Sequence, residues 1–229
     1  MNALATTPGF AHPVDDAQAV FRALLAALSR PGLPVTVFTP PPPLPQSNFS
    51  QGLLALALTL CDRDTPLWLD EAADTPQTRH HLRFHCGSPV VAEPAQAAFA
   101  FIARPEAMPR LHVFNQGRAD FPDRSATLIL SADLSAPHGL PYELSGPGVR
   151  GNALGRWQAF RAAGLPDWFV EDWAANQSAY PLGVDVALVE TGAGDCGEPQ
   201  IRLLGLPRTA RLRQAVHWPA ATKEAAVCM

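Results

Sequence analysis

The sequence predicts a single α/β domain over residues 1–229, in which a mixed β-sheet is covered by helices on both faces. Short apolar runs rich in β-branched residues, such as 184–189, have the pattern of buried strands. In the first half of the chain these runs alternate with helical segments, whereas in the second half two strands form a hairpin. Hydrophobic residues make up 47% of the 229 positions, which is enough apolar material for one core.

Helices are predicted where apolar residues recur at helical spacing or where proline opens a first turn: 15–29, 53–60, 76–84, 166–177 and a short one at Pro105. Asp15 is the expected N-cap of the first helix, with Gln18 placed as in a capping box. Strands are predicted at 35–38, 67–69, 89–92, 97–103, 127–130, 142–144, 184–190 and 201–206. Residues 1–13 and 220–229 are expected to be flexible, and the proline run 40–45 to be extended.

Composition excludes several classes of partner. A net charge of −4 and a pI near 5.9 argue against nucleic acid and against a polybasic membrane surface. No segment approaches the roughly 18 apolar residues that a membrane span needs. The first 14 residues lack the pattern of a signal peptide, and Cys61, Cys86, Cys196 and Cys228 are scattered like reduced thiols. We therefore expect a cytoplasmic protein.

The lysine count limits the chemistry. Lys223 is the only lysine, so the chain has no P-loop lysine and no interior lysine for a Schiff base with pyridoxal phosphate. Recognition of anions falls to sixteen arginines, whose planar guanidinium suits bidentate capture of phosphate or carboxylate. We expect no cofactor.

Asp185 is unusual because it places a carboxylate inside the apolar run 179–190. A buried carboxylate without a partner would cost several kcal/mol, so Asp185 must be paired, protonated or at a strand end. The strand 201–206 returns antiparallel and brings Arg208 near the start of the first strand. We predict a salt bridge between Asp185 and Arg208 that holds the ends of the hairpin together, either as a structural pair or as part of a site.

His81 and His85 stand four residues apart, the spacing of two metal ligands on one helix face. Gly87 and Pro89 end the helix nearby, and no glutamate accompanies the pair as in a His-Glu-x-x-His motif. Because a third ligand is missing, we expect a hydrogen-bonded histidine at a helix end and no metal.

A set of short motifs, in order over nearly the whole chain, resembles the PhnH family of bacterial phosphonate metabolism. The matching stretches are 12–18 with Phe21-Arg22, 29–32, 60–69, 82–85, 126–130, 144–148, 180–185 and 206–209. The departures are the proline run 40–45, the longer loop before Pro199 and the C-terminal tail.

The resemblance implies a fold like the large domain of pyridoxal-phosphate-dependent transferases, without the cofactor. It implies assembly with PhnG, PhnI and PhnJ in the carbon–phosphorus lyase complex, which couples an alkylphosphonate to a nucleoside triphosphate and displaces the base. The radical iron–sulfur chemistry belongs to PhnJ. The family supplies no catalytic residue to carry over to this chain.

Two roles follow, an assembly subunit and a subunit with a phosphate or phosphonate site of its own. An exposed cluster of Arg83, His85, Asp185 and Arg208 would favour a ligand site, and the same residues in a satisfied network would favour assembly. We further expect a homodimer of the isolated chain. Its expected interface uses aromatic residues that one helix face cannot bury: Trp157, Trp168, Phe169 and Trp173.

Overall fold

The computed structural model describes residues 7–150, 152, 155–194 and 196–215. The tail predicted to be flexible lies outside these residues, as do residues 1–6. Residues 7–12 precede the first helix, and the carbonyl of Thr7 lies 3.0 Å from Nε2 of His85.

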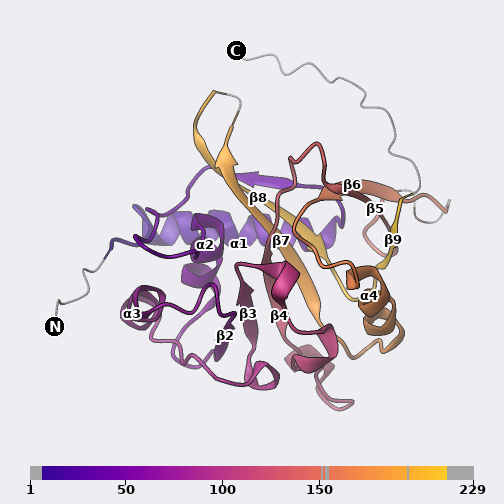
Figure 1. The fold of residues 1–229 in the computed structure, drawn as a ribbon, viewed down its shortest axis with the longest axis horizontal. Helices are drawn as coiled ribbons and strands as arrows, with labels where there is room; N and C mark the ends of the chain where they lie inside the picture. Colours follow the sequence, from indigo (N-terminus) through magenta and orange to yellow (C-terminus); the bar gives the residue numbers. More distant parts are fainter. Residues whose placement is uncertain (1–6, 151, 153–154, 195, 216–229) are drawn as a thin grey trace.

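A six-stranded mixed sheet forms the centre of the fold, with strand order β1-β8-β7-β4-β3-β2 (Figure 1). Four neighbouring strands run parallel: β2 (Leu67–Leu69), β3 (Phe99–Ile102), β4 (Thr127–Ser131) and β7 (Asp185–Ala193). β8 (Pro199–Leu206) returns antiparallel beside β7, and β1 (Val35–Val37) pairs antiparallel with β8. The prediction of an α/β fold with a mixed sheet is confirmed.

One face of the sheet is covered mainly by helices. α1 (Pro13–Ser29) packs on β8 and β1, α2 (Gln51–Leu60) packs on β7 and β4, and α3 (Pro76–His85) packs on α2. Side chains from alternate strand positions, such as Ile129 and Val189, meet these helices in one core. α2 is apolar on nearly every side and is buried, as its sequence predicts.

The other face is covered by α4 (Phe169–Ser178) together with a second sheet, of order β6-β5-β9. This sheet contains β6 (Gln158–Ala162), β5 (Leu140–Ser145) and β9 (Arg211–Gln214). The expectation of helices on both faces is therefore only partly right. The small sheet escaped prediction because β6 and β9 are short and alternate apolar with polar residues, so neither forms an apolar run.

The aromatic residues around α4 are not the exposed surface that the sequence suggested. Phe169 and Trp173 are wholly buried in the second core, and Nε1 of Trp173 donates to the carbonyl of Ala210 at 2.8 Å. Trp168 is partly buried, and Arg213 lies over the Trp157 ring at 4.0 Å from its centroid. The small sheet buries the aromatic side chains that one helix face could not bury, because α4 packs on β9 of that sheet.

Several local expectations need correction. α1 begins at Pro13 with His12 as its N-cap, and the carboxylate of Asp16, not that of Asp15, accepts the His12 N–H at 2.8 Å. Residues 89–92 do not form a strand, since only Val90 makes an isolated bridge to Leu67. The helix predicted at Pro105 is a single 3₁₀ turn. The 3₁₀ turns with assigned bounds are Pro94–Gln96, Pro105–Ala107, Leu111–Val113 and Pro122–Arg124.

Gly205 in β8 allows α1 to approach the sheet closely. A Cβ at this position would lie 2.5 Å from the Ala27 carbonyl oxygen and 2.6 Å from Leu28 Cα. We predict that Gly205→Ala lowers the free energy of unfolding by about 1–3 kcal/mol, because the helix backbone must shift. Gly192→Ala in β7 is the matched control, because a Cβ there meets nothing within 4 Å. Urea unfolding that shows equal stability for both variants would contradict this account of the packing.

Candidate functional site

The first polar site lies where β7 begins, at the amino edge of the parallel strands. Asn176 of α4 binds both backbone groups of Val184, donating from Nδ2 to the carbonyl at 2.9 Å and accepting its N–H at 2.8 Å. Gly183 precedes this contact at φ +111°, and a Cβ there would lie 2.7 Å from Oδ1 of Asn176. Only glycine fits this backbone and this close approach.

Asp185 and Arg208 form the predicted salt bridge, with Nη2 of Arg208 2.6 Å from Oδ2 of Asp185. Oδ1 of Asp185 also accepts the backbone N–H of Arg208 at 2.7 Å, and Arg208 Nε lies 3.2 Å from both carboxylate oxygens. Nη1 of Arg208 donates to the carbonyls of Pro122 and Pro181 at 3.1 and 3.3 Å. The pair is mostly buried, since the side chains of Arg208 and Asp185 are 12% and 24% exposed. Its charges and donors are thus largely satisfied within the chain.

Arg83 and His85 do not join this pair. Both are exposed on α3, and Arg83 lines a pocket with Val90, which bridges to β2. Strands β3 and β4 lie between β2 and β7. At the usual strand spacing, β2 is therefore about 14 Å from β7, where Asp185 lies. The structure therefore brings two of the four candidate residues together and leaves the other two on a separate surface.

His81 is fully buried beneath His85, with ring centroids 4.2 Å apart. Among the residues that the structure describes, neither of its ring nitrogens finds a hydrogen-bond partner. Burial, followed by the charges of His85 and His80, lowers the pKa of His81 to about 4, because a cation here would lack water and an acceptor. Within residues 7–150, 152, 155–194 and 196–215 no three histidine, cysteine or acidic side chains gather as metal ligands would.

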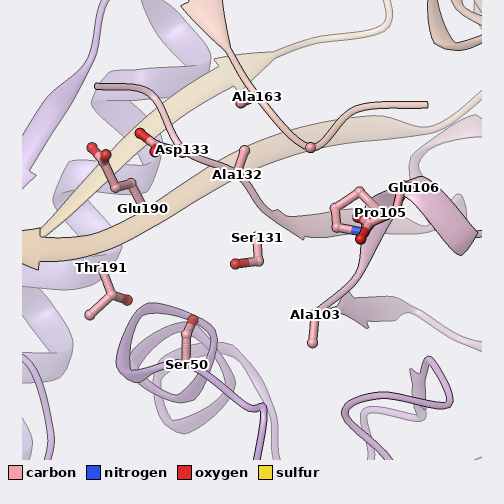
Figure 2. A pocket seen from close by; sticks show the side chains of 11 residues that line it. Ser50, Ala103, Pro105, Glu106, Ser131, Ala132, Asp133, Ala163, Glu190 and Thr191 are labelled. Carbon is pink, nitrogen blue, oxygen red and sulfur yellow. The ribbon is translucent and has the colours of Figure 1, made fainter. Parts of the chain in front are cut away.

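A second polar site lies at the opposite edge, where the parallel strands end, and borders an open pocket of about 420 Å³ (Figure 2). Its walls come from the ends of β3, β4 and β7 and from the start of α2, the edge where open α/β sheets bind ligands. Three hydroxyl residues, Ser50, Ser131 and Thr191, surround the pocket. Glu106, Asp133 and Glu190 give it acidic character. The sequence analysis missed this site, although Ser131 directly follows one predicted strand and Glu190 ends another.

Several polar groups of this pocket are bound to neighbouring residues of the fold. Thr191 Oγ1 accepts the N–H of Gly52 at 2.9 Å, and Ser50 caps α2 by accepting the N–H of Leu53. Glu190 accepts the backbone N–H and the hydroxyl of Ser135 through its two oxygens and pairs with Arg202 at 3.0 Å. The N–H groups of Gly52 and Leu53 and the carboxylate of Glu190 are therefore already bound within the fold.

These observations define an α/β protein whose polar sites use arginine, carboxylate and hydroxyl groups, and whose described helices include none long and apolar enough to cross a bilayer. The chain belongs to the PhnH family, because the family model described as "Bacterial phosphonate metabolism protein (PhnH)" matches residues 8–213. A relative from Rhizobium meliloti (strain 1021) is named alpha-D-ribose 1-methylphosphonate 5-triphosphate synthase subunit PhnH. It is 35% identical over 208 residues, which cover 90% of this chain and 94% of the relative.

The bonding of Asp185 leads to a stability prediction. Asp185→Ala should lower the free energy of unfolding by about 2–4 kcal/mol, because Arg208 is left partly buried without its carboxylate. The matched control is Asp120→Ala, whose exposed pair with Arg118 should contribute less than about 1 kcal/mol. Both values come from urea unfolding at neutral pH. Equal losses for the two variants would show that the pair at β7 is not a stabilising contact.

The buried His81 leads to a prediction about how the free energy of unfolding depends on pH. Its pKa is lowered in the folded state, so unfolding takes up a proton between the folded value of about 4 and the ordinary value of 6.5. The free energy of unfolding is therefore highest above pH 6.5. It falls as the pH drops towards 4, with a slope that approaches about 1.4 kcal/mol per pH unit. His81→Phe should remove this component, as measured by urea unfolding at pH 7, 6, 5 and 4.5. An unchanged pH slope in the variant would refute the assignment.

Proposed function

We propose that this chain is the PhnH subunit of a carbon–phosphorus lyase core complex in phosphonate catabolism, together with PhnG, PhnI and PhnJ. In that complex it would support transfer of an alkylphosphonate to the ribose triphosphate of a nucleoside triphosphate, with release of the base. Membership of the family and the name of the 35% identical relative support this proposal.

The role we favour is assembly, and the Asp185–Arg208 network is the observation that carries it. A ligand site needs donors that remain open, whereas Arg208 uses its guanidinium on Asp185, Pro122 and Pro181. At the other edge, Ser135 and Glu190 resemble a nucleophile with a base. Both Glu190 oxygens are already bound, and Arg202 holds one of them. This arrangement favours a structural role over acid–base catalysis.

A ligand-binding role is the alternative, and Arg83 favours it. This side chain is exposed and makes no hydrogen bond or ion pair with the described part of the chain. It lines an open pocket of about 360 Å³ with Arg79 and with residues 87–90. Arg79 is held by Asp74, so the pocket offers one uncompensated guanidinium for a phosphate or phosphonate.

The proposal also includes a homodimer of the isolated chain, a cytoplasmic location and a fold related to pyridoxal-phosphate-dependent transferases that no longer uses the cofactor. Cys61 and Cys86 are free thiols, as suits a reducing compartment. The single lysine, Lys223, lies outside the described residues.

A binding experiment distinguishes the assembly role from the ligand-binding role. We predict that the isolated chain takes up neither ATP nor methylphosphonate in calorimetric titrations, yet co-purifies with PhnG, PhnI and PhnJ and is required for synthase activity of the reconstituted complex. Submillimolar binding to the isolated chain that disappears in Arg83→Ala and persists in Arg118→Ala would instead establish the ligand-binding role. Failure to co-purify with the other subunits would overturn the assembly role.

A further inference from the structure

Strand β9 (Arg211–Gln214) lies at an edge of the small sheet, whose order is β6-β5-β9 (Figure 1). It pairs antiparallel with β5, so that Arg213 faces Glu143 and Arg211 faces Ser145, and it also packs on α4. In the part of the chain that the structure describes, no strand pairs with the other edge of β9. An open strand edge can accept a further strand from another chain.

The register shows which backbone groups of β9 are open. The N–H of Ala215 donates to the carbonyl of Pro141 at 2.9 Å, one position beyond the pair of Gln214 with Tyr142. Bonded and non-bonded pairs alternate in an antiparallel ladder, so residues 211 and 213 turn their N–H and C=O groups towards β5. Leu212 and Gln214 therefore turn theirs away from β5. Among the described residues these outward groups have no hydrogen-bond partner.

Two arginines stand on the outer face of β9. Arg211 and Arg213 are exposed, and they lie on the face opposite to Leu212, which belongs to the core. The centroid of the Trp157 ring is 5.7 Å from the guanidinium of Arg211 and 4.0 Å from that of Arg213. These cation–π contacts hold both guanidinium groups over the sheet before a partner binds, which lowers the entropy cost of binding.

The small sheet is positively charged, although the whole chain carries a net charge of −4. Its three strands hold one acidic residue, Glu143, and three arginines: Arg161, Arg211 and Arg213. Glu143 pairs with Arg213 at 2.6 Å. Arg211 has no ion-pair partner within the described residues, and its Nη2 donates to the hydroxyl of Ser145 at 3.3 Å. The uncompensated charge favours an acidic partner.

We propose that β9 is a docking edge on which another subunit of the proposed complex adds an extended acidic segment as a fourth strand of the small sheet. The backbone of this segment bonds to the outward N–H and C=O groups of Leu212 and Gln214. Its acidic side chains, at alternate positions, lie beside Arg211 and Arg213, because residues two apart share one face of a strand. A second copy of this chain does not fit, since β9 against β9 brings like charges together.

This inference rests on the proposed assembly role and names a surface through which the chain fulfils it. Charged residues on a strand edge have a simpler use, which is to prevent aggregation through that edge. Protection alone leaves the amides of Leu212 and Gln214 open to solvent in the complex, whereas docking of a strand buries them. The two uses therefore differ in a measurable way.

Hydrogen exchange tests the open edge directly. In the isolated chain, the amides of Leu212 and Gln214 should exchange about tenfold or more faster than those of Arg211 and Arg213, which bond to β5. In the complex with PhnG, PhnI and PhnJ, the amides of Leu212 and Gln214 should slow by about tenfold or more.

A proline substitution tests the backbone contact without changing the charge. Gln214→Pro removes an N–H that faces away from β5, and edge strands accept proline at such a position. Binding to the other three subunits, measured by biolayer interferometry, should weaken by about tenfold. Gln214→Ala is the matched control, because it keeps the N–H and should bind like the unaltered chain. Circular dichroism should show an unchanged fold in both variants.

Charge variants test the acidic character of the partner. Arg211→Glu should weaken binding to the other subunits by about tenfold or more, whereas Arg211→Lys keeps the charge and should weaken it less than about threefold. The difference between Arg211→Glu and the unaltered chain should narrow as salt is added, because salt screens exposed charges. Arg118→Glu, which changes a 78% exposed arginine outside the small sheet, is the matched control and should bind normally.

Two results would overturn the proposal while the assembly role stands. The first is that Arg211→Glu and Gln214→Pro, both folded, bind the other subunits as tightly as the unaltered chain does. The second is that the amides of Leu212 and Gln214 exchange as fast in the complex as in the isolated chain. Failure of the unaltered chain to bind the other subunits would instead refute the assembly role, and the docking edge with it.

Discussion

The fold depends on how the start of β7 is held. Asn176 binds the backbone of Val184, and Asp185 binds both the backbone and the side chain of Arg208 at the end of the hairpin. Arg208 reaches on to the carbonyl of Pro122, in the segment that leads into β4. One short segment thereby fixes α4, β8 and the entry to β4 relative to β7, which pairs with β4 on one side and β8 on the other.

This constraint also bears on function. At the opposite edge, where α/β sheets usually bind ligands, Thr191 accepts the backbone N–H of Gly52, and Glu190 accepts the hydroxyl of Ser135. Groups that complete a fold are not free to recognise a substrate. The open features are instead on the surface, at Arg83 of α3 and at the exposed apolar residues of α1. This distribution of bound and open polar groups supports the assembly role that we propose.

Sequence patterns predicted the structure correctly where it is determined by local residues or by the register of paired strands. The apolar run beginning at Val184 and its antiparallel return placed Arg208 beside Asp185, and the apolar character of α2 predicted its burial. Patterns were insufficient where distant segments decide the outcome. The strand Arg211–Gln214 has one inward apolar residue, so its sheet could not be foreseen, and neither could the burial of Trp173 against it. The pocket at Ser131 combines several separate segments, which no spacing rule connects.

Hydrogen exchange at the amides of Val184 and Arg208 tests the central claim most directly, because both amides donate within the network at the start of β7. If this network is a closed structural element, both amides should exchange only through global unfolding, with the free energy of opening equal to the global value. Their rates should also be unchanged by ATP or methylphosphonate. Fast exchange through local opening, or a change in rate on adding either ligand, would contradict the account.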